Sequence, residues 1–331
     1  MPGARVTAIA SGRRANAAAT AREFDIPQVF DDGLALAASP DVDLVIISST
    51  PDTHLRYAVA ALEAGKHVLC EKPMALTAAE AGQMLAAAER RPRQLAWIDH
   101  ELRYEPNRRK ARDLIRAGAI GSVRHIEMVL RPYLRGDGRP QTAAAPWTWW
   151  FEATKGGGIL GAVGSHLIDL CRFWTGSEVT HVAGGTATFV PERRDDAGTP
   201  RPVTADDFAS FVLRLAGGAV ATLTLTTVAS HGVGHHAHIT GTEGTFVLTG
   251  ETKLELGRPG DPLEDVSAAD DLSGQLPVDN LWGRAFVRLL RELVRVLEGG
   301  VAAGTPATFK DGLAVQRVLD AVRAGGATPL D

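Results

Sequence analysis

The first residue with a chemical signature is Lys72, in the motif Glu71-Lys72-Pro73. The motif directly follows an apolar run, residues 67–70, that predicts a buried strand. An ammonium group at the end of a strand can orient a substrate oxygen and help to move its proton. The alternative is a lysine in a surface ion pair, and the motif alone leaves both open.

A second motif places His166 after a glycine-rich segment, residues 156–164. Ser165 and His166 begin a predicted helix, and Asp169 shares a helix face with the histidine. A histidine at a helix start inside a cleft can act as an acid or a base, and Asp169 can orient its ring. The alternative is a glycine-rich turn with a histidine in the core.

A third motif, SSTPDTH at residues 48–54, joins a buried strand to a helix. Open α/β sheets bind ligands at the carboxyl ends of their strands, and a helix start offers backbone N–H groups to phosphate. We therefore expect Ser49, Thr50, Pro51 and His54 to bind a cofactor. The alternative is a capped strand–turn–helix without a ligand.

The first hundred residues alternate strands with helices. Strands are predicted at residues 5–10, 43–48, 67–70 and 94–98, and helices at residues 16–24, 34–38, 51–64 and 77–90. This alternation predicts an α/β fold with a doubly wound parallel sheet over residues 1–102.

Strand-like runs dominate after residue 103. They lie at residues 123–130, 179–189, 208–215, 219–227, 235–240 and 245–248, and helices are predicted at residues 106–117, 282–297 and 311–322. Residues 103–331 therefore predict an α+β domain on a mostly antiparallel open sheet. The polar segment 191–202 predicts a mobile loop.

Length and composition exclude several classes of protein. A chain of 331 residues predicts two domains, and 45% hydrophobic with 22% charged residues is typical of a globular protein. With a net charge of −4 and no basic half, we expect no nucleic-acid partner. Apolar runs are far shorter than the roughly 20 residues that span a bilayer, so we expect no membrane partner. Two cysteines without a CxxC pair favour a reducing compartment, the cytoplasm.

Together, the motifs resemble the glucose–fructose oxidoreductase / inositol dehydrogenase / MocA (Gfo/Idh/MocA) family of NAD(P)-dependent oxidoreductases. The resemblance runs along nearly the whole chain, through residues 51–54, 65–68, 71–73, 114–121, 156–169 and 241–244. It implies an N-terminal Rossmann domain and a C-terminal α/β domain whose open sheet forms a homo-oligomer, a dimer or tetramer. It also implies hydride transfer to or from a sugar, cyclitol or related alcohol or ketone. The family's catalytic lysine matches Lys72, and its catalytic histidine matches His166.

The sequence departs from the family pattern in two places. The family's aspartate four residues before the histidine is matched by Ala162, so a Lys–Asp–His triad is not present. The family's first strand and G-x-G-x-x-G turn are also absent, although they would form the centre of the sheet and hold the cofactor pyrophosphate. We expect that the true start lies upstream of Met1; the alternative is a truncated, cofactor-free protein.

The segment Ser11-Gly12-Arg13-Arg14 predicts the cofactor preference. An NAD enzyme places an acid after this strand, near the ribose hydroxyls, whereas this chain has a hydroxyl and two guanidinium groups. Arginine suits a 2′-phosphate, so we expect NADP, with NAD as the alternative. The resemblance also implies that Glu71 and Lys72 contact the cofactor.

Other candidates have weaker signals. Arg103 and Tyr104 follow the last predicted Rossmann strand and are candidates to contact the substrate. Trp150, in a cluster of three tryptophans, can wall a sugar pocket or simply pack in the core. His235, His236 and His238 suggest a metal site, since His236 and His238 share one strand face. The sequence supplies no third or fourth ligand nearby, and we expect no metal.

The sequence thus predicts an NADP-preferring oxidoreductase that acts on a sugar-like small molecule, with Lys72 and His166 as its catalytic residues. The rival interpretation is a non-catalytic family member used in assembly or in small-molecule sensing. Ala162 and the missing glycine turn favour this rival.

Overall fold

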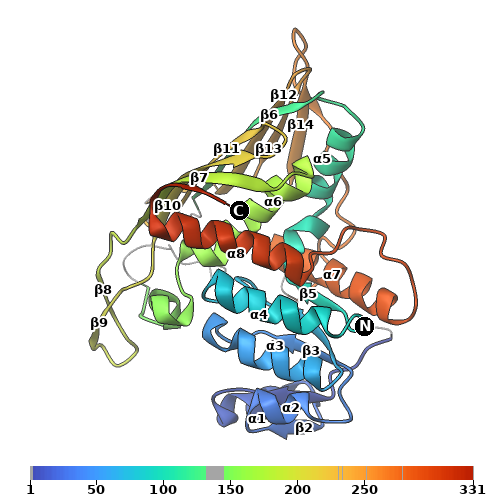
Figure 1. Cartoon of the computed structure of the whole chain (residues 1–331), viewed down its shortest axis with the longest axis vertical. Coiled ribbons are helices and arrows are strands. Elements are labelled where there is room, and N and C mark those ends of the chain that lie inside the picture. Colours follow the sequence, from blue (N-terminus) through green and yellow to red (C-terminus); the bar gives the residue numbers. More distant parts are fainter. Residues whose placement is uncertain are drawn as a thin grey trace. The chain divides into compact units, whose positions relative to one another are not determined.

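The computed structural model describes residues 3–131, 145–229, 231–232, 234–250, 252–277 and 279–330. It divides into two compact units. The first unit comprises Met1–His100 and Arg288–Gln316, and the second comprises Glu101–Val287 and Arg317–Asp331. Figure 1 shows helices α7 (Leu281–Leu297) and α8 (Phe309–Ala324). Each of these helices contributes residues to both units.

Strands and helices alternate along the first unit, as the sequence predicts. The strands are β1 (Ala8–Ala10), β2 (Gln28–Phe30), β3 (Leu44–Ile47), β4 (His67–Cys70) and β5 (Ala96–Ile98), and the helices are α1 (Arg14–Glu23), α2 (Gly33–Ala37), α3 (His54–Glu63) and α4 (Ala78–Glu89). Strands β3, β4 and β5 form a parallel sheet in that order, and β1 and β2 form a second parallel pair. The predicted α/β fold is confirmed.

The described strands of this unit leave an interruption between β1 and β3. These two strands belong to different sheets, and Ile46 on β3 is 44% exposed. Just before the two strands, the Thr7 hydroxyl donates a hydrogen bond to the carbonyl of Asp41 at 3.1 Å. The interruption lies where the sequence predicts the family's central strand to be absent.

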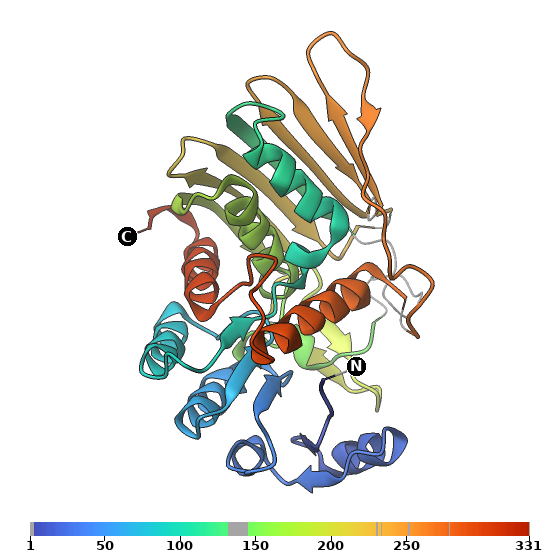
Figure 2. The ribbon, with the colours of Figure 1, turned by 90° about the vertical axis from the view of Figure 1, so that its right-hand side faces the viewer.

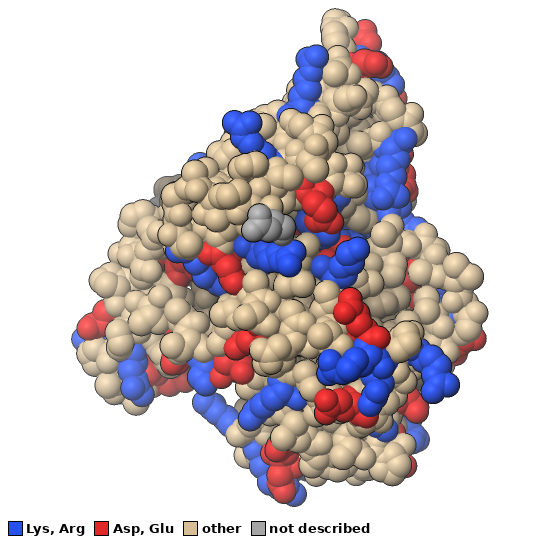
Figure 3. Space-filling model, viewed as in Figure 1, with Lys and Arg blue, Asp and Glu red and all other residues tan. Residues whose placement is uncertain are grey.

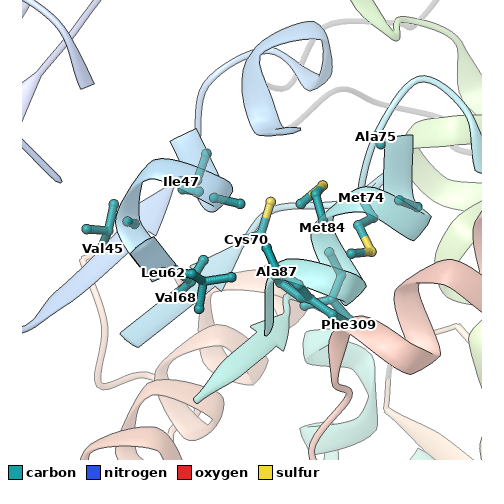
Figure 4. Packing of buried hydrophobic residues seen from close by; sticks show 14 of the residues in the cluster. Val45, Ile47, Leu62, Val68, Cys70, Met74, Ala75, Met84, Ala87 and Phe309 are labelled. Atoms are coloured by element: carbon teal, nitrogen blue, oxygen red, sulfur yellow. The ribbon is translucent and has the colours of Figure 1, made fainter. Parts of the chain in front are cut away.

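One hydrophobic core holds β3 and β4 in register (Figure 4). It includes Val45, Ile47, Val68 and Cys70 from the two strands, Leu62 from α3, Met84 and Ala87 from α4, and Phe309 from α8. A shift by one residue would turn these buried strand residues to the other face, which makes the register strongly specified. The packing therefore fixes where each strand ends.

The second unit is built on a nine-stranded sheet with the order β15-β14-β13-β12-β6-β11-β10-β7-β16. The strands are β6 (Val123–Arg131), β7 (Val179–Ala187), β10 (Phe208–Leu215), β11 (Val220–Thr226), β12 (Gly234–Gly241), β13 (Thr245–Thr249), β14 (Lys253–Gly257), β15 (Glu264–Asp265) and β16 (Gly326–Pro329). Neighbours are antiparallel except β6 and β11, which are parallel. The predicted mostly antiparallel sheet is confirmed.

Helices cover one face of this sheet. Helices α5 (Pro106–Arg116) and α6 (Ser165–Thr175) lie against it (Figure 2). Along β6, Ile126 and Met128 are buried, whereas Glu127 between them is exposed. This period of two is expected of a strand with one face in the core and one face open.

The prediction of a mobile loop at residues 191–202 is wrong. Strands β8 (Glu192–Arg194) and β9 (Pro200–Pro202) pair there as an antiparallel hairpin. Asp195 closes the turn, because its side chain accepts hydrogen bonds from the backbone N–H groups of Ala197 at 3.1 Å and Thr199 at 2.9 Å. Proline is tolerated in such an edge strand, where an N–H donor is not needed on the outer side.

Basic and acidic side chains are interspersed on the molecular face in Figure 3, without a large patch of one sign. Within the described residues, no helix combines the length and the apolar character that crossing a membrane requires.

Candidate active site

Lys72 lies at the carboxyl edge of the parallel sheet of the first unit. Strands β3, β4 and β5 are parallel neighbours, so the residues that follow them meet at one edge. The ladder continues past the strands: Glu71 N donates to the carbonyl of Ile47 at 2.9 Å, and Asp99 N donates to that of Cys70 at 2.8 Å. Lys72 is the next residue after this ladder, and it is half-buried.

Carboxylates surround the end of β4. Burial, and after it the charges of Glu71 and Asp99, raise the pKa of the Cys70 thiol well above its usual value. Lys72 N lies 3.2 Å from the Glu71 Oε2 that accepts its hydrogen bond. The Lys72–Pro73 peptide bond is cis. Lys72 thus lies at the same edge of the sheet as the carboxylates of Glu71 and Asp99.

His54 lies in the interior, where its ring contacts backbone carbonyl groups. It is fully buried, and burial lowers its pKa. Its Nε2 lies 3.0 Å from the carbonyl oxygen of Ser49, and its Nδ1 lies 3.2 Å from that of Pro73 and 3.3 Å from that of Met74. The ring therefore ties the loop after β3 to the loop after β4, and its contact with a cofactor stays a prediction.

The hydroxyl groups after β3 organise the start of α3. Thr50 precedes a short 3₁₀ turn, Pro51–Thr53, that leads into the helix. The Thr53 hydroxyl donates to the carbonyl of Thr50 at 2.8 Å and lies 2.6 Å from the hydroxyl of Ser49. Ser49 is exposed and Thr50 half-exposed, whereas Pro51 is buried. Ser49 and Thr50 are thus accessible to a ligand at this edge.

The segment predicted to select the cofactor is exposed at the end of β1. The hydroxyl of Ser11 accepts a hydrogen bond from Arg13 N at 3.2 Å, and Arg13 precedes α1. Arg14 forms an ion pair with Asp31, which follows β2. Both side chains of this pair are mostly exposed, so the pair is weak and its guanidinium can exchange partners.

Glycines 156–158 wrap around two fixed groups in the second unit. Gly158 N donates to the carbonyl of Trp150 at 3.0 Å, and a Cβ on Gly157 would collide with the same carbonyl. Gly158 has φ +105°, and a Cβ there would collide with the carboxylate of Asp206. Asp206 accepts a hydrogen bond from Leu160 N at 2.7 Å, and burial raises its pKa.

This segment leads to His166 through one π-helical turn, Leu160–Gly164, before α6 begins at Ser165. His166 is 1% exposed. Its Nε2 lies 3.6 Å from Oε2 of Glu101, and its ring centroid lies 5.2 Å from that of Trp282. Single π-helical turns occur frequently at functional sites. The histidine is therefore held between a carboxylate and an aromatic ring.

Asp169 and Arg103 form a buried pair with each other. Arg103 donates from Nε to Oδ2 of Asp169 at 2.7 Å and from Nη2 to Oδ1 at 2.6 Å. The guanidinium group lies 5.3 Å from the ring centroid of Phe173. The guanidinium of Arg103, predicted to contact the substrate, is thus committed to Asp169. Both oxygens of Asp169, predicted to orient His166, accept from this arginine.

The remaining predicted residues, Tyr104 and Trp150, lie in the second unit. Tyr104 is buried in the 3₁₀ turn Glu101–Tyr104. Trp150 is half-buried, and its carbonyl positions Gly158. Sequence reasoning missed Glu101 and Trp282. The available signal for Glu101 is its place just after the strand predicted at residues 94–98, where side chains meet at the carboxyl edge of a sheet.

His235 has a partner other than a metal. Its Nδ1 accepts a hydrogen bond from Nη2 of Arg108 at 2.5 Å, and Nη1 of Arg108 pairs with Glu105 at 2.9 Å. His238 lies on the opposite, exposed face of β12. Within the part of the chain that the structure describes, no group of three or more His, Cys, Asp or Glu side chains is placed to hold a metal ion.

Comparison with known proteins gives consistent matches over both units. Residues 1–100 match "Oxidoreductase family, NAD-binding Rossmann fold", and residues 108–247 match "GFO/IDH/MocA C-terminal domain". An uncharacterized oxidoreductase of Synechocystis is 34% identical over 71% of this chain and 62% of its own length. Glucose-fructose oxidoreductase domain-containing protein 2 of Xenopus laevis is 30% identical over 93% of this chain and 82% of its own length.

A solved structure is also similar. Levoglucosan dehydrogenase in complex with NADH and levoglucosan superposes with a TM-score of 0.83 at 26% identity, over 98% of this chain and 90% of that chain.

Proposed function

The chain belongs to the Gfo/Idh/MocA family of oxidoreductases, and from this premise we propose that it transfers hydride between a nicotinamide cofactor and a sugar-like alcohol or its ketone. The observation that carries the proposal is the position of Lys72 at the carboxyl edge of the parallel sheet, where β3 and β4 end together. Open α/β sheets bind dinucleotides at this edge. The similarity to an enzyme solved with NADH and levoglucosan supports the same chemistry.

The residues at this edge fit a nicotinamide dinucleotide. Ser49 and Thr50 present hydroxyl groups there, and Lys72 supplies positive charge to an anionic ligand. At the end of β1, a Cβ on Gly12 would meet nothing within 4 Å, so this turn is open to a ligand. The cofactor, when bound, supplies the hydride acceptor or donor.

Lys72 binds and polarises the reacting oxygen of the substrate in this proposal. During oxidation, the O–H bond of the alcohol breaks and its proton passes to the imidazole of His166. An oxidised nicotinamide, when bound, would supply the acceptor for the hydride that the carbon of the alcohol gives up as its C=O bond forms. A positioned acid or base of this kind contributes about 10²–10⁴-fold to the rate.

We infer a preference for NADP over NAD from Ser11, Arg13 and Arg14. The two arginines are exposed, and the weak pair of Arg14 with Asp31 can give way to a ligand phosphate. NAD is the alternative cofactor, and Asp31 favours it because a carboxylate in this region repels a 2′-phosphate.

We further propose a cytoplasmic homo-oligomer, a dimer or tetramer, in which a second copy covers the open face of the nine-stranded sheet. The face carries half-exposed or exposed side chains such as Val212, Thr222, Thr224 and Val129, which suit a subunit interface. Light scattering of the purified protein tests this: a monomeric mass contradicts it.

A non-catalytic role is the second candidate function. Ala162 favours it, because the family's acid is absent there. An assay with NAD⁺ and NADP⁺ on a panel of sugars and cyclitols, levoglucosan included, separates the two functions. Reduction of either cofactor by any member of the panel supports the enzyme, and tight cofactor or sugar binding without turnover supports the sensor.

A further inference from the structure

Glu101 and His166 form a buried acid–imidazole pair in the second unit. Glu101 opens the 3₁₀ turn before α5, and His166 is the second residue of α6. The two side chains are 6% and 1% exposed, and Oε2 of Glu101 lies 3.6 Å from Nε2 of His166. A carboxylate this close to an imidazole favours its protonated form and restricts its rotation.

The residues one turn before and one turn after His166 have either no acidic group or other partners. Ala162, one turn before His166, has no carboxylate. Asp169, nearly one turn after it, accepts two hydrogen bonds from Arg103, and Arg172 lies 3.6 Å from its Oδ1. The charge of Asp169 is thereby balanced by arginines. Glu101 is the carboxylate that the structure places at Nε2 of His166.

We propose that Glu101 is the positioning residue for His166 and that it takes over the part of the acid absent at position 162. It holds the imidazole ring against Trp282 and stabilises the imidazolium that forms when the proton of the alcohol reaches His166. This inference rests on the proposed function for its catalytic meaning. The pairing itself rests on geometry alone.

The first test measures the titration of the His166 ring by NMR in the unliganded protein, with a His166→Asn variant to identify its resonances. Glu101→Gln keeps the shape of the side chain and removes the charge. We expect the midpoint of the titration to fall by at least about one pH unit, because an opposite charge at this distance shifts a pKa by about 1–3. An unchanged midpoint overturns the proposal.

Glu105→Gln is the matched control. Glu105 is a buried carboxylate four residues after Glu101, and it caps α5 and pairs with Arg108. Its loss should lower stability and leave the His166 midpoint where it is; an equal shift in both variants overturns a specific role for Glu101. If Glu101→Gln does not fold, Glu101→Asp should give an intermediate shift, and no shift contradicts the pairing.

A second readout separates this inference from the proposed function. In an active protein, the limb of the kcat profile that reports His166 should move to lower pH in Glu101→Gln together with the NMR midpoint. An NMR shift with a stationary limb overturns the positioning role. An NMR shift in a protein without any turnover leaves the pairing standing and contradicts the proposed function.

Discussion

Ala162 removes an acid from the turn that precedes His166, and Glu101 brings one from a different element. The two residues are far apart in the sequence, so spacing along α6 could not reveal the substitution. At the same scale, Arg103 and Asp169 satisfy each other's charge in the interior, which keeps both side chains in place. Lys72 and His166 remain the proposed catalytic residues.

Arg13 and Arg14 provide a prediction about cofactor choice. A charged hydrogen bond to a 2′-phosphate contributes about 1.5–3 kcal/mol, or roughly 10–150-fold in affinity. The Arg13→Ala/Arg14→Ala variant should therefore weaken NADPH binding by that order and leave NADH binding nearly unchanged, as measured by fluorescence titration. Added salt should erode the preference, because both side chains are exposed.

Arg22→Ala is the control, since Arg22 is an exposed arginine in the last turn of the same helix. It should affect neither cofactor. Equal affinity of the wild type for NADH and NADPH, or equal weakening of both in the double variant, contradicts the assignment.

His235 provides a prediction about stability in acid. Burial, and after it the charges of Arg108 and His236, hold the pKa of His235 well below its usual value. In the unfolded chain, His235 takes up a proton near pH 6.5, whereas in the folded chain its ring stays neutral at that pH. The titration of His235 therefore does not reduce the free energy of unfolding above about pH 6.5. Below that pH it lowers this free energy by up to about 1.4 kcal/mol per pH unit.

His235→Gln keeps a hydrogen-bond acceptor for Arg108 without a titrating ring, so urea unfolding should depend less on pH between about 6.5 and 5. Some dependence remains, because burial also lowers the pKa of His54 and of His67. His238→Gln, at an exposed position of the same strand, should keep the wild-type slope. An identical slope for His235→Gln and the wild type would show that His235 does not contribute.

The ends of helices and strands determine where the candidate catalytic residues lie. The helix α6 begins only after the glycines have turned the chain around Asp206 and Trp150, and this turn determines where His166 lies. The strand ends of the first unit do the same for Lys72, because the buried residues of β3 and β4 fix the register.

Gly158→Ala should disturb the second unit strongly. The residue has φ +105°, and its new Cβ would also collide with the Asp206 carboxylate. The strained backbone alone costs about 1–3 kcal/mol, so the urea midpoint should fall clearly. Gly185→Ala on β7, where a Cβ meets nothing within 4 Å, is the control and should be close to wild type. Equal midpoints for the two variants would contradict this account of the glycine segment.

Local patterns predicted most elements of the first unit, since strands such as β3 are apolar runs and α4 begins at a Thr77 side chain that accepts from Glu80 N at 3.2 Å. The hairpin β8–β9 escaped prediction because its strands are short and polar, with proline in one of them. Strand β16 escaped because Gly326–Pro329 has no strand pattern, and its pairing with β7 is made by distant residues. Long-range pairing of this kind leaves no local signal.

Each of the two compact units is built from two separate segments of the chain. Residues 288–316 join the first unit, where Phe309 enters the core and Ile98 N donates to the carbonyl of Ala307 at 3.0 Å. Sequence patterns along the first hundred residues could not reveal this return of the chain.

The most direct test of the central claim compares two lysines at opposite ends of β4. Lys72 follows the strand at its carboxyl end, whereas Lys66 precedes it and donates to the carbonyl of Ser39 at 2.8 Å. On the substrate that the wild type oxidises fastest, Lys72→Ala should lower kcat by about 10²–10⁴-fold, and Lys66→Ala should retain wild-type turnover. Wild-type turnover in Lys72→Ala, or an equal loss in both variants, would contradict the proposed role of Lys72 at the carboxyl edge of the sheet.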